Sequence, residues 1–299
     1  MNFMTGEGRP MKLGVTFPQT EIGQDPAAIR EYAQTAEELG YSHLIAFDHV
    51  LGANPAGHDG WKGPYDFRHL FHEPLVLFGY LAAVTSRLEL VTAVVILPQR
   101  QTALVAKQTA EIDVLSNGRL RFGVGIGWNH VEYEGLGETF WDRGQRCEEQ
   151  IEVLRALWTQ ETVNFEGHWH KITSAGINPL PIQRPIPIWI GGTHDRVIRR
   201  IARAADGWFP QFQPGVEAQL ALQKLRDYAS AEGRDPSGIG VEGRVNIANK
   251  NESEWEQAYT DWKQMGASHL AVNTMGAGLT TPQEHIRQIV RFKQVIDSM

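Results

Sequence analysis

Residues 120–129, LRFGVGIGWN, decide the fold and show where to look for a ligand. The alternating apolar residues Leu120, Phe122 and Val124 predict a buried strand. Glycines occupy every second position along it, at 123, 125 and 127. Glycine weakens a strand and often marks a point that a ligand or another backbone approaches closely. We therefore expect this strand to end at a binding site.

The bulk composition is that of an ordinary globular protein, with 42% hydrophobic and 21% charged residues in a chain of 299. Its net charge of −7 argues against non-specific nucleic-acid binding, which requires a basic face. The single cysteine, Cys147, falls on an apolar helical face and is interpreted as core. It cannot form an internal disulfide, which favours a reducing, cytoplasmic location. No apolar run predicts a membrane span, and residues 1–10 are expected to be a disordered leader.

Strand-like and helix-like segments alternate over residues 11–299, where we expect a single domain. An inserted hairpin and loop is expected at about 160–187, where four prolines break the rhythm. Eight strand-then-helix units favour a closed α/β barrel of the (β/α)₈ TIM type, with insertions, over an open sheet. The expected strands are 12–17, 43–47, 89–97, the stretch from Leu120, 188–190, 207–210, 241–248 and 269–272.

The carboxyl ends of the strands carry the active site in such barrels, so the residues that follow each strand are the candidates. Asp48 and His49 end the apolar strand LIAF. A histidine at this place can exchange a proton near neutral pH. The alternative is a simple turn, with Asp48 as a cap and His49 hydrogen-bonded; position alone does not separate the two.

Gly191, Gly192 and Thr193 follow the apolar strand PIWI and precede a helix. Free N–H groups at a helix start attract anions, and glycines let a phosphate come close. We favour a phosphate site here over a plain tight turn.

Several other patterns argue against common alternatives. The glycine spacing G-x-G-x-G lacks the acidic residue that ends the second strand of a dinucleotide-binding unit. His168 and His170 resemble a metal pair, but a hairpin with alternating residues explains them better, and we expect no metal. A metal-dependent barrel hydrolase is disfavoured because the first strand ends in Thr16 to Gln19 rather than in an H-x-H pair.

Three segments together resemble the luciferase-like monooxygenase superfamily, in the branch that uses the deazaflavin coenzyme F420. They are AEELGYSHLIAFDHV (36–50), LVTAVVILPQRQTALVAKQTAEIDVLSNGRLRFGVGIGWNHVEYEGLG (90–137) and PIWIGGTHDRVIRRIARAADGWFP (187–210). The resemblance implies a (β/α)₈ barrel with the ring of the coenzyme in its mouth. It also implies a homodimer that acts on a small-molecule substrate.

The resemblance assigns roles to individual residues. The ring would rest on a bulge with a non-proline cis peptide near Ala93 and Val94, and the phosphate would lie against Gly191, Gly192 and Thr193. His49 would take or give the proton. Asp48, Gly127 and Asn129 would also contact the coenzyme, and the substrate pocket would include Gln19, Trp61, Trp128 and Trp208, with the loop 48–72 as a lid.

One departure from the family bears on the substrate. Family dehydrogenases of sugar phosphates carry a glutamate just after the fourth strand, where this chain has Trp128. This replacement argues for a more apolar substrate, or for a reductase of activated double bonds. The sequence thus predicts an F420-dependent oxidoreductase. An FMN-dependent monooxygenase of the same superfamily is the close alternative, and a non-catalytic cofactor carrier is a more distant one.

Overall fold

The computed structural model describes residues 10–299, so residues 1–9 of the expected leader lie outside the described part. Within this part, parallel strands close into an eight-stranded barrel, in which β3 and β4 together form one interrupted strand. Each neighbouring pair runs parallel, and β5 pairs with both β3 and β4. The strands are β1 Lys12–Thr16, β2 His43–Ala46, β3 Glu89–Thr92, β4 Val95–Ile96, β5 Leu120–Gly125, β8 Ile188–Gly191, β9 Gly207–Phe209, β10 Gly240–Asn246 and β11 His269–Asn273.

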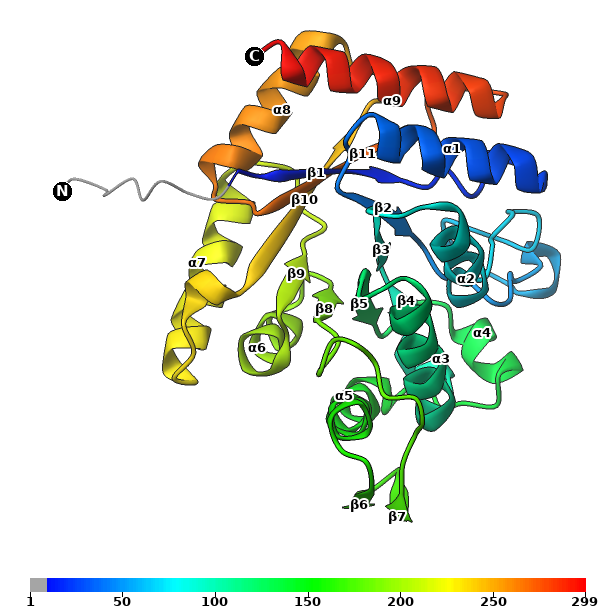
Figure 1. Ribbon diagram of the computed structural model, residues 1–299, viewed down its shortest axis with the longest axis vertical. Helices are drawn as coiled ribbons and strands as arrows, with labels where there is room; N and C mark the ends of the chain where they lie inside the picture. The colour runs from blue at the N-terminus through cyan, green and yellow to red at the C-terminus, as the bar shows by residue number, and fades with distance from the viewer. Residues whose placement is uncertain (1–9) are drawn as a thin grey trace.

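Helices surround the barrel, and most of them bury apolar residues against it (Figure 1). The last helix, α9, packs beside the first, α1, and brings the two ends of the barrel wall together. Several helix starts are held by side-chain caps, as with Asp25 before α1 and Thr281 before α9. The helices are α1 Pro26–Glu38, α2 Pro74–Val84, α3 Thr102–Leu115, α4 His130–Gly135, α5 Arg143–Thr159, α6 Asp195–Ala204, α7 Val216–Ala231, α8 Glu252–Gln264 and α9 Pro282–Asp297.

The third barrel strand is interrupted, whereas the sequence predicts a single strand over 89–97. It breaks after Thr92 and resumes at Val95, and the peptide bond between Ala93 and Val94 is cis. The cis bond implied by the family resemblance is therefore present at the expected place. At this break, the backbone of Ala93 and Val94 bulges into the mouth of the barrel, where it faces the end of β5.

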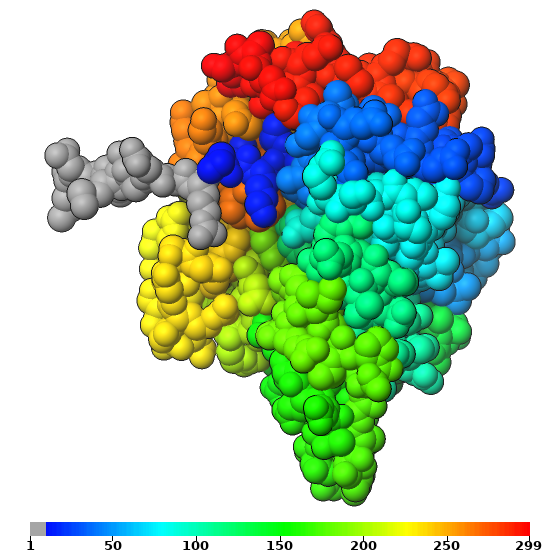
Figure 2. All heavy atoms as spheres, viewed as in Figure 1, coloured from blue at the N-terminus to red at the C-terminus, as the bar shows by residue number. Residues whose placement is uncertain are grey.

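The chain between α5 and β8 forms an antiparallel hairpin of β6 Val163–Glu166 and β7 Lys171–Ala175. This hairpin projects from the body of the molecule (Figure 2). Glu149 of α5 accepts hydrogen bonds from the backbone N–H groups of His168, Trp169 and His170, which fixes its turn. No helix among the described residues is long and apolar enough to cross a membrane.

Candidate active site

A cavity of 390 Å³ lies at the carboxyl ends of the barrel strands, where barrel enzymes carry their active sites. Its size falls in the range of pockets for small ligands and cofactors. Most of it is built by the end of β2, the bulge between β3 and β4, and the loops after β5 and β8, and Tyr65, Gln211 and Arg244 complete it. The lining residues are Phe47, Asp48, His49, Tyr65, Ala93, Val94, Ile96, Gly125, Ile126, Gly127, Trp128, Gly191, Gly192, Thr193, His194, Val197, Gln211 and Arg244.

The glycines beside the bulge are needed for close packing. A Cβ added to Gly125 would overlap the side chain of Val94, and one added to Gly191 would lie 2.9 Å from it. Gly127 has a φ of +62°, which a side chain disfavours, and a Cβ there would lie 2.8 Å from Ile96. The glycines therefore leave room for the side chain of Val94, which forms this wall of the cavity together with the backbone of Gly125 and Gly191.

His49 is the one histidine among the cavity residues that is paired with a buried carboxylate. Its Nδ1 lies 3.3 Å from Oε2 of Glu132, a residue of α4 that is 1% exposed. The other oxygen, Oε1, accepts hydrogen bonds from the backbone N–H groups of Val50 and Leu51. Burial alone would raise the pKa of Glu132. The hydrogen bonds from His49 and the two N–H groups outweigh it, so the pKa lies below its usual value.

An ionised Glu132 determines how the imidazole ring can act. A carboxylate only accepts hydrogen bonds, so it selects the form of His49 that carries its proton on Nδ1. In that form Nε2 carries the lone pair of the ring. Aromatic side chains hold the ring edge-on, with centroids 4.7 Å away for Phe71, 5.4 Å for Tyr65 and 5.5 Å for Trp128.

Asp48 lies beside His49, yet both of its oxygens are already engaged. Oδ2 accepts a hydrogen bond from the backbone N–H of Ile96 at 2.9 Å, and Oδ1 pairs with Arg100 at 2.8 Å. Burial raises the pKa of Asp48, and the guanidinium of Arg100 opposes that shift. Asp48 therefore connects the end of β2 to β4.

The loop Gly191 to Thr193 leads into α6 at the edge of the cavity. Gly192 has a φ of +130°, and a Cβ there would lie 3.2 Å from Val197. The backbone oxygen of Gly192 accepts a hydrogen bond of 2.7 Å from Nε1 of Trp208. Trp208 is fully buried, so it supports the loop from behind. The side chain of His194 caps the N–H of Arg196 at the start of α6. The loop backbone before this cap is the part that could bind a phosphate.

Arg244 of β10 lines the cavity, and its side chain makes no hydrogen bond or ion pair with residues 10–299. Its guanidinium carbon lies 5.1 Å from the ring centroid of Phe47. Burial lowers the pKa of Arg244, and Glu242 partly offsets this. Arginine nevertheless stays charged, so the cavity contains a cation without a partner.

Glu242 does not neutralise Arg244 because its two oxygens bind other groups deeper in the barrel. Oε1 contacts Nε2 of His43 and Oε2 contacts Arg121, each at 2.5 Å. Arg121 also pairs with Glu89 and stacks over Trp189. A polar cluster thus fills the barrel below the cavity.

Several residues expected at the site take other positions. Gln19 is fully buried and exchanges two hydrogen bonds with the backbone of Phe47. Asn129 caps α4 through Val131 N–H and donates to the carbonyl of Leu51. Trp61 stacks on Trp128, at 5.6 Å, from the loop side. None of these three, nor Trp208, lines the cavity.

The H-x-H pair is a structural element of the hairpin. Nδ1 of His170 lies 2.7 Å from Glu149 and Nε2 lies 2.6 Å from the hydroxyl of Thr102. Across the residues that the structure describes, no group of three His, Cys, Asp or Glu side chains is arranged to hold a metal ion.

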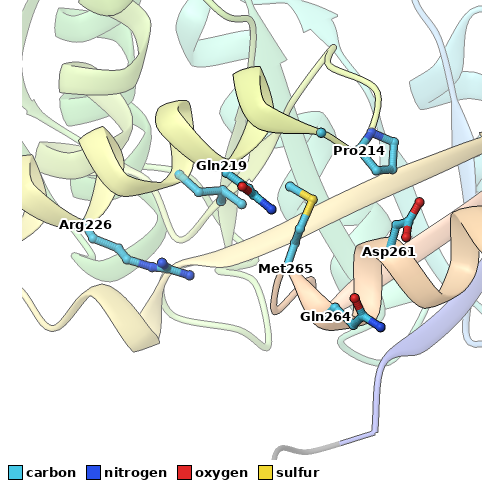
Figure 3. Close-up of a pocket in the computed structure, with 8 residues that line it drawn as sticks. Pro214, Gln219, Arg226, Asp261, Gln264 and Met265 are labelled. Atoms are coloured by element: carbon cyan, nitrogen blue, oxygen red, sulfur yellow. The ribbon is translucent and has the colours of Figure 1, made fainter. Parts of the chain in front are cut away.

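A larger hollow of 680 Å³ lies between α7 and α8. Figure 3 shows Gln219 and Arg226 on α7 and Asp261 and Gln264 on α8 around it. It lies on the outer helical layer rather than at the strand ends. None of the strand-end residues that could carry chemistry reaches it, so we place the active site at the barrel mouth.

Comparison with known proteins decides the family. The model of the luciferase-like monooxygenase family matches residues 11–294. The chain belongs to this family. Membership makes the protein an enzyme of the oxidoreductase and monooxygenase kind, and it agrees with the barrel and with the cis peptide in the bulge.

Relatives within the family use different cofactors. An F420-dependent glucose-6-phosphate dehydrogenase from Segniliparus rotundus is 29% identical, over 77% of this chain and 66% of its own length. An FMNH2-dependent dimethylsulfone monooxygenase from Pseudomonas putida is also 29% identical, over 75% of this chain and 59% of its own. Among solved structures, a monooxygenase from Streptomyces bottropensis superposes with a TM-score of 0.76 at 21% identity, covering 96% of this chain and 98% of its own. The identities alone do not separate the two cofactors.

Proposed function

We propose that this luciferase-like protein is an F420-dependent oxidoreductase, which moves a hydride between the deazaflavin and a small organic substrate. The observation that carries the proposal is the position of His49. It lines the cavity that also contains Val94, Gly125 and Gly191, and it is oriented by a buried carboxylate 3.3 Å away. A proton-transfer group beside a site for a planar ring is what oxidation of an alcohol, or reduction of a polarised double bond, requires.

The cofactor would lie with its ring against Ala93, Val94 and Gly125 and with its phosphate on the loop Gly191 to Thr193. When bound, the deazaflavin supplies the hydride chemistry. The fit rests on the absent side chains, because a Cβ at Gly125 or Gly191 would collide with Val94 and change this wall.

The protein's own groups would then orient the substrate and move the proton. Nε2 of His49 takes a proton from the substrate in one direction and returns it in the other. Arg244 would stabilise an oxygen that gains negative charge as the hydride moves. Trp128 and Tyr65 would enclose the apolar part of the substrate, so we favour a partly apolar molecule with one polarised oxygen over a sugar phosphate.

An FMN-dependent monooxygenase is the second candidate, favoured by the equal identity to the dimethylsulfone monooxygenase. Titration of the purified protein with F420 and with FMN, in oxidised and reduced forms, followed by fluorescence, separates the two. We expect saturable binding of F420 and no saturable binding of FMN at the same concentrations. Tight FMN binding without F420 binding would overturn the proposal.

A further inference from the structure

A second hollow adjoins the active-site cavity on the side of the phosphate loop. It has a volume of 780 Å³ and lies between α5 and α6. The two hollows share Ile126, His194 and Val197, so they lie side by side. We call it the α5–α6 groove. Its lining is Ile126, Trp141, Asp142, Arg143, Gly144, Gln145, Glu148, His194, Arg196, Val197, Arg199, Arg200 and Arg203.

The α5–α6 groove is strongly basic on an acidic protein. Five arginines and two carboxylates give it a net charge of about +3, whereas the whole chain carries −7. Three of the arginines are paired: Arg199 with Asp195, and both Arg200 and Arg203 with Glu148.

Two cations in the groove have no carboxylate partner within the described residues. Arg143 stacks over Phe140 at 3.7 Å and donates to its carbonyl oxygen, while its buried Nε has no hydrogen-bond partner. Arg196 is exposed, lies in the first turn of α6, and makes no side-chain hydrogen bond to residues 10–299. It stands three residues after Thr193, directly beyond the loop assigned to the phosphate.

We propose that the α5–α6 groove binds the anionic tail of the deazaflavin coenzyme, an inference that rests on the proposed function. FMN ends at its phosphate. F420 continues beyond its phosphate with a lactyl group and a chain of glutamates, each of which adds a carboxylate. A groove that begins at the phosphate loop and offers unpaired arginines matches a ligand that continues past the phosphate, and it has no counterpart in FMN.

Affinity for three forms of the deazaflavin tests this directly, without any measurement of turnover. The forms are the alcohol without phosphate, the phospholactate without glutamate, and the form with several glutamates. We expect the glutamate form to bind the wild-type protein about fivefold more tightly than the phospholactate form, as for one or two exposed ion pairs. The advantage should shrink in 0.5 M salt because the contacts are exposed.

A matched pair of variants locates the effect. Arg196→Gln should reduce the logarithm of the affinity ratio between the glutamate and phospholactate forms by about half. It should leave the affinity for the alcohol unchanged. Arg226→Gln removes the same charge from the hollow between α7 and α8 (Figure 3) and should change neither affinity. Equal affinity for the phospholactate and glutamate forms would overturn the tail site while leaving the cofactor assignment intact. Binding of FMN, with no binding of any deazaflavin form, would overturn both.

Discussion

Glu132 of α4 reaches across the active-site rim to His49, with Oε2 3.3 Å from Nδ1. The two residues are separated by 83 positions in the sequence and come from different units of the barrel. The N–H groups of Val50 and Leu51 fix Oε1 of the same carboxylate, and Nε2 of Gln99 donates a hydrogen bond of 3.3 Å to Oε2, so the carboxylate is held in place beside His49. The pair therefore sets which nitrogen of His49 carries the ring proton.

Glu132→Gln should reverse that choice. The two N–H groups require an oxygen on their side, so the new amide would present its NH₂ group to Nδ1 of His49 and place the ring proton on Nε2. We expect kcat to fall on the order of 10²-fold, in the range lost when a general acid or base is removed. The dissociation constant of the cofactor should stay within about twofold. Full turnover in this variant, once a substrate is in hand, would remove Glu132 from the mechanism.

Trp208→Phe tests the support behind the phosphate loop. The change keeps most of the packing but deletes the hydrogen bond to the carbonyl of Gly192. A hydrogen bond contributes about 1 kcal/mol, so affinity for a cofactor with a phosphate should weaken about fivefold. Affinity for the deazaflavin alcohol, which lacks the phosphate, serves as the internal control. An equal loss for both ligands would mean that Trp208 acts on the whole cavity rather than on the loop.

Arg244→Met should lower activity without lowering stability. A partly buried cation without a partner costs free energy, so its removal should leave the free energy of unfolding unchanged or raise it by about 1 kcal/mol. Arg121→Met is the matched control, since it leaves the buried Glu242 with less of its compensation and should cost about 3–5 kcal/mol. Urea unfolding of the two variants measures both effects. Comparable destabilisation by both would show that Arg244 serves the barrel rather than the ligand.

The polar cluster below the cavity predicts the response to acid. His269 of β11 belongs to this cluster, because its ring centroid lies 5.5 Å from that of His43 and 5.1 Å from that of Trp189. Burial, aided by the charge of Arg121, lowers the pKa of His269 to about 3, whereas an unfolded histidine titrates near 6.5. Between these values the unfolded chain binds more protons, so stability is full above pH 6.5 and falls as the pH decreases toward 3. The slope from this residue approaches about 1.4 kcal/mol per pH unit.

His269→Gln should flatten the dependence of unfolding free energy on pH between 6 and 4. It should not abolish it, because burial also lowers the pKa of His285, to about 4, with the same sign. Denaturant unfolding at a series of pH values provides the measurement. Parallel curves for the variant and the wild type would contradict the assignment.

The sequence predicted the barrel well because alternation of apolar segments is a local property of each unit. It predicted the strand ends for the same reason, and His49, Trp128 and the Gly191 loop do line the cavity. The direction of a side chain at a strand end is set by tertiary packing. The spacing therefore could not show that Gln19 and Trp208 are buried behind the wall.

Glu132 shows how a local signal can mislead. Asn129 and Glu132 have the N-x-x-E spacing of a capping box, which would direct the glutamate back to its own helix start. Asn129 does cap the helix, but Glu132 turns to His49 instead. Gly123 is a comparable case. It faces Thr92 and Phe209 rather than the cavity, so only two of the three alternating glycines line the cavity.

Val94 stands between two glycines from different strands, and this arrangement constrains how the site can change over generations. Alanine at Gly125 or at Gly191 meets the same valine side chain. Either replacement becomes tolerable only after position 94 has become smaller, whereas a smaller residue at 94 needs no prior change. Mutational routes that reshape this wall should therefore begin at Val94. Relatives with a side chain at either glycine position should carry glycine or alanine at the position of Val94.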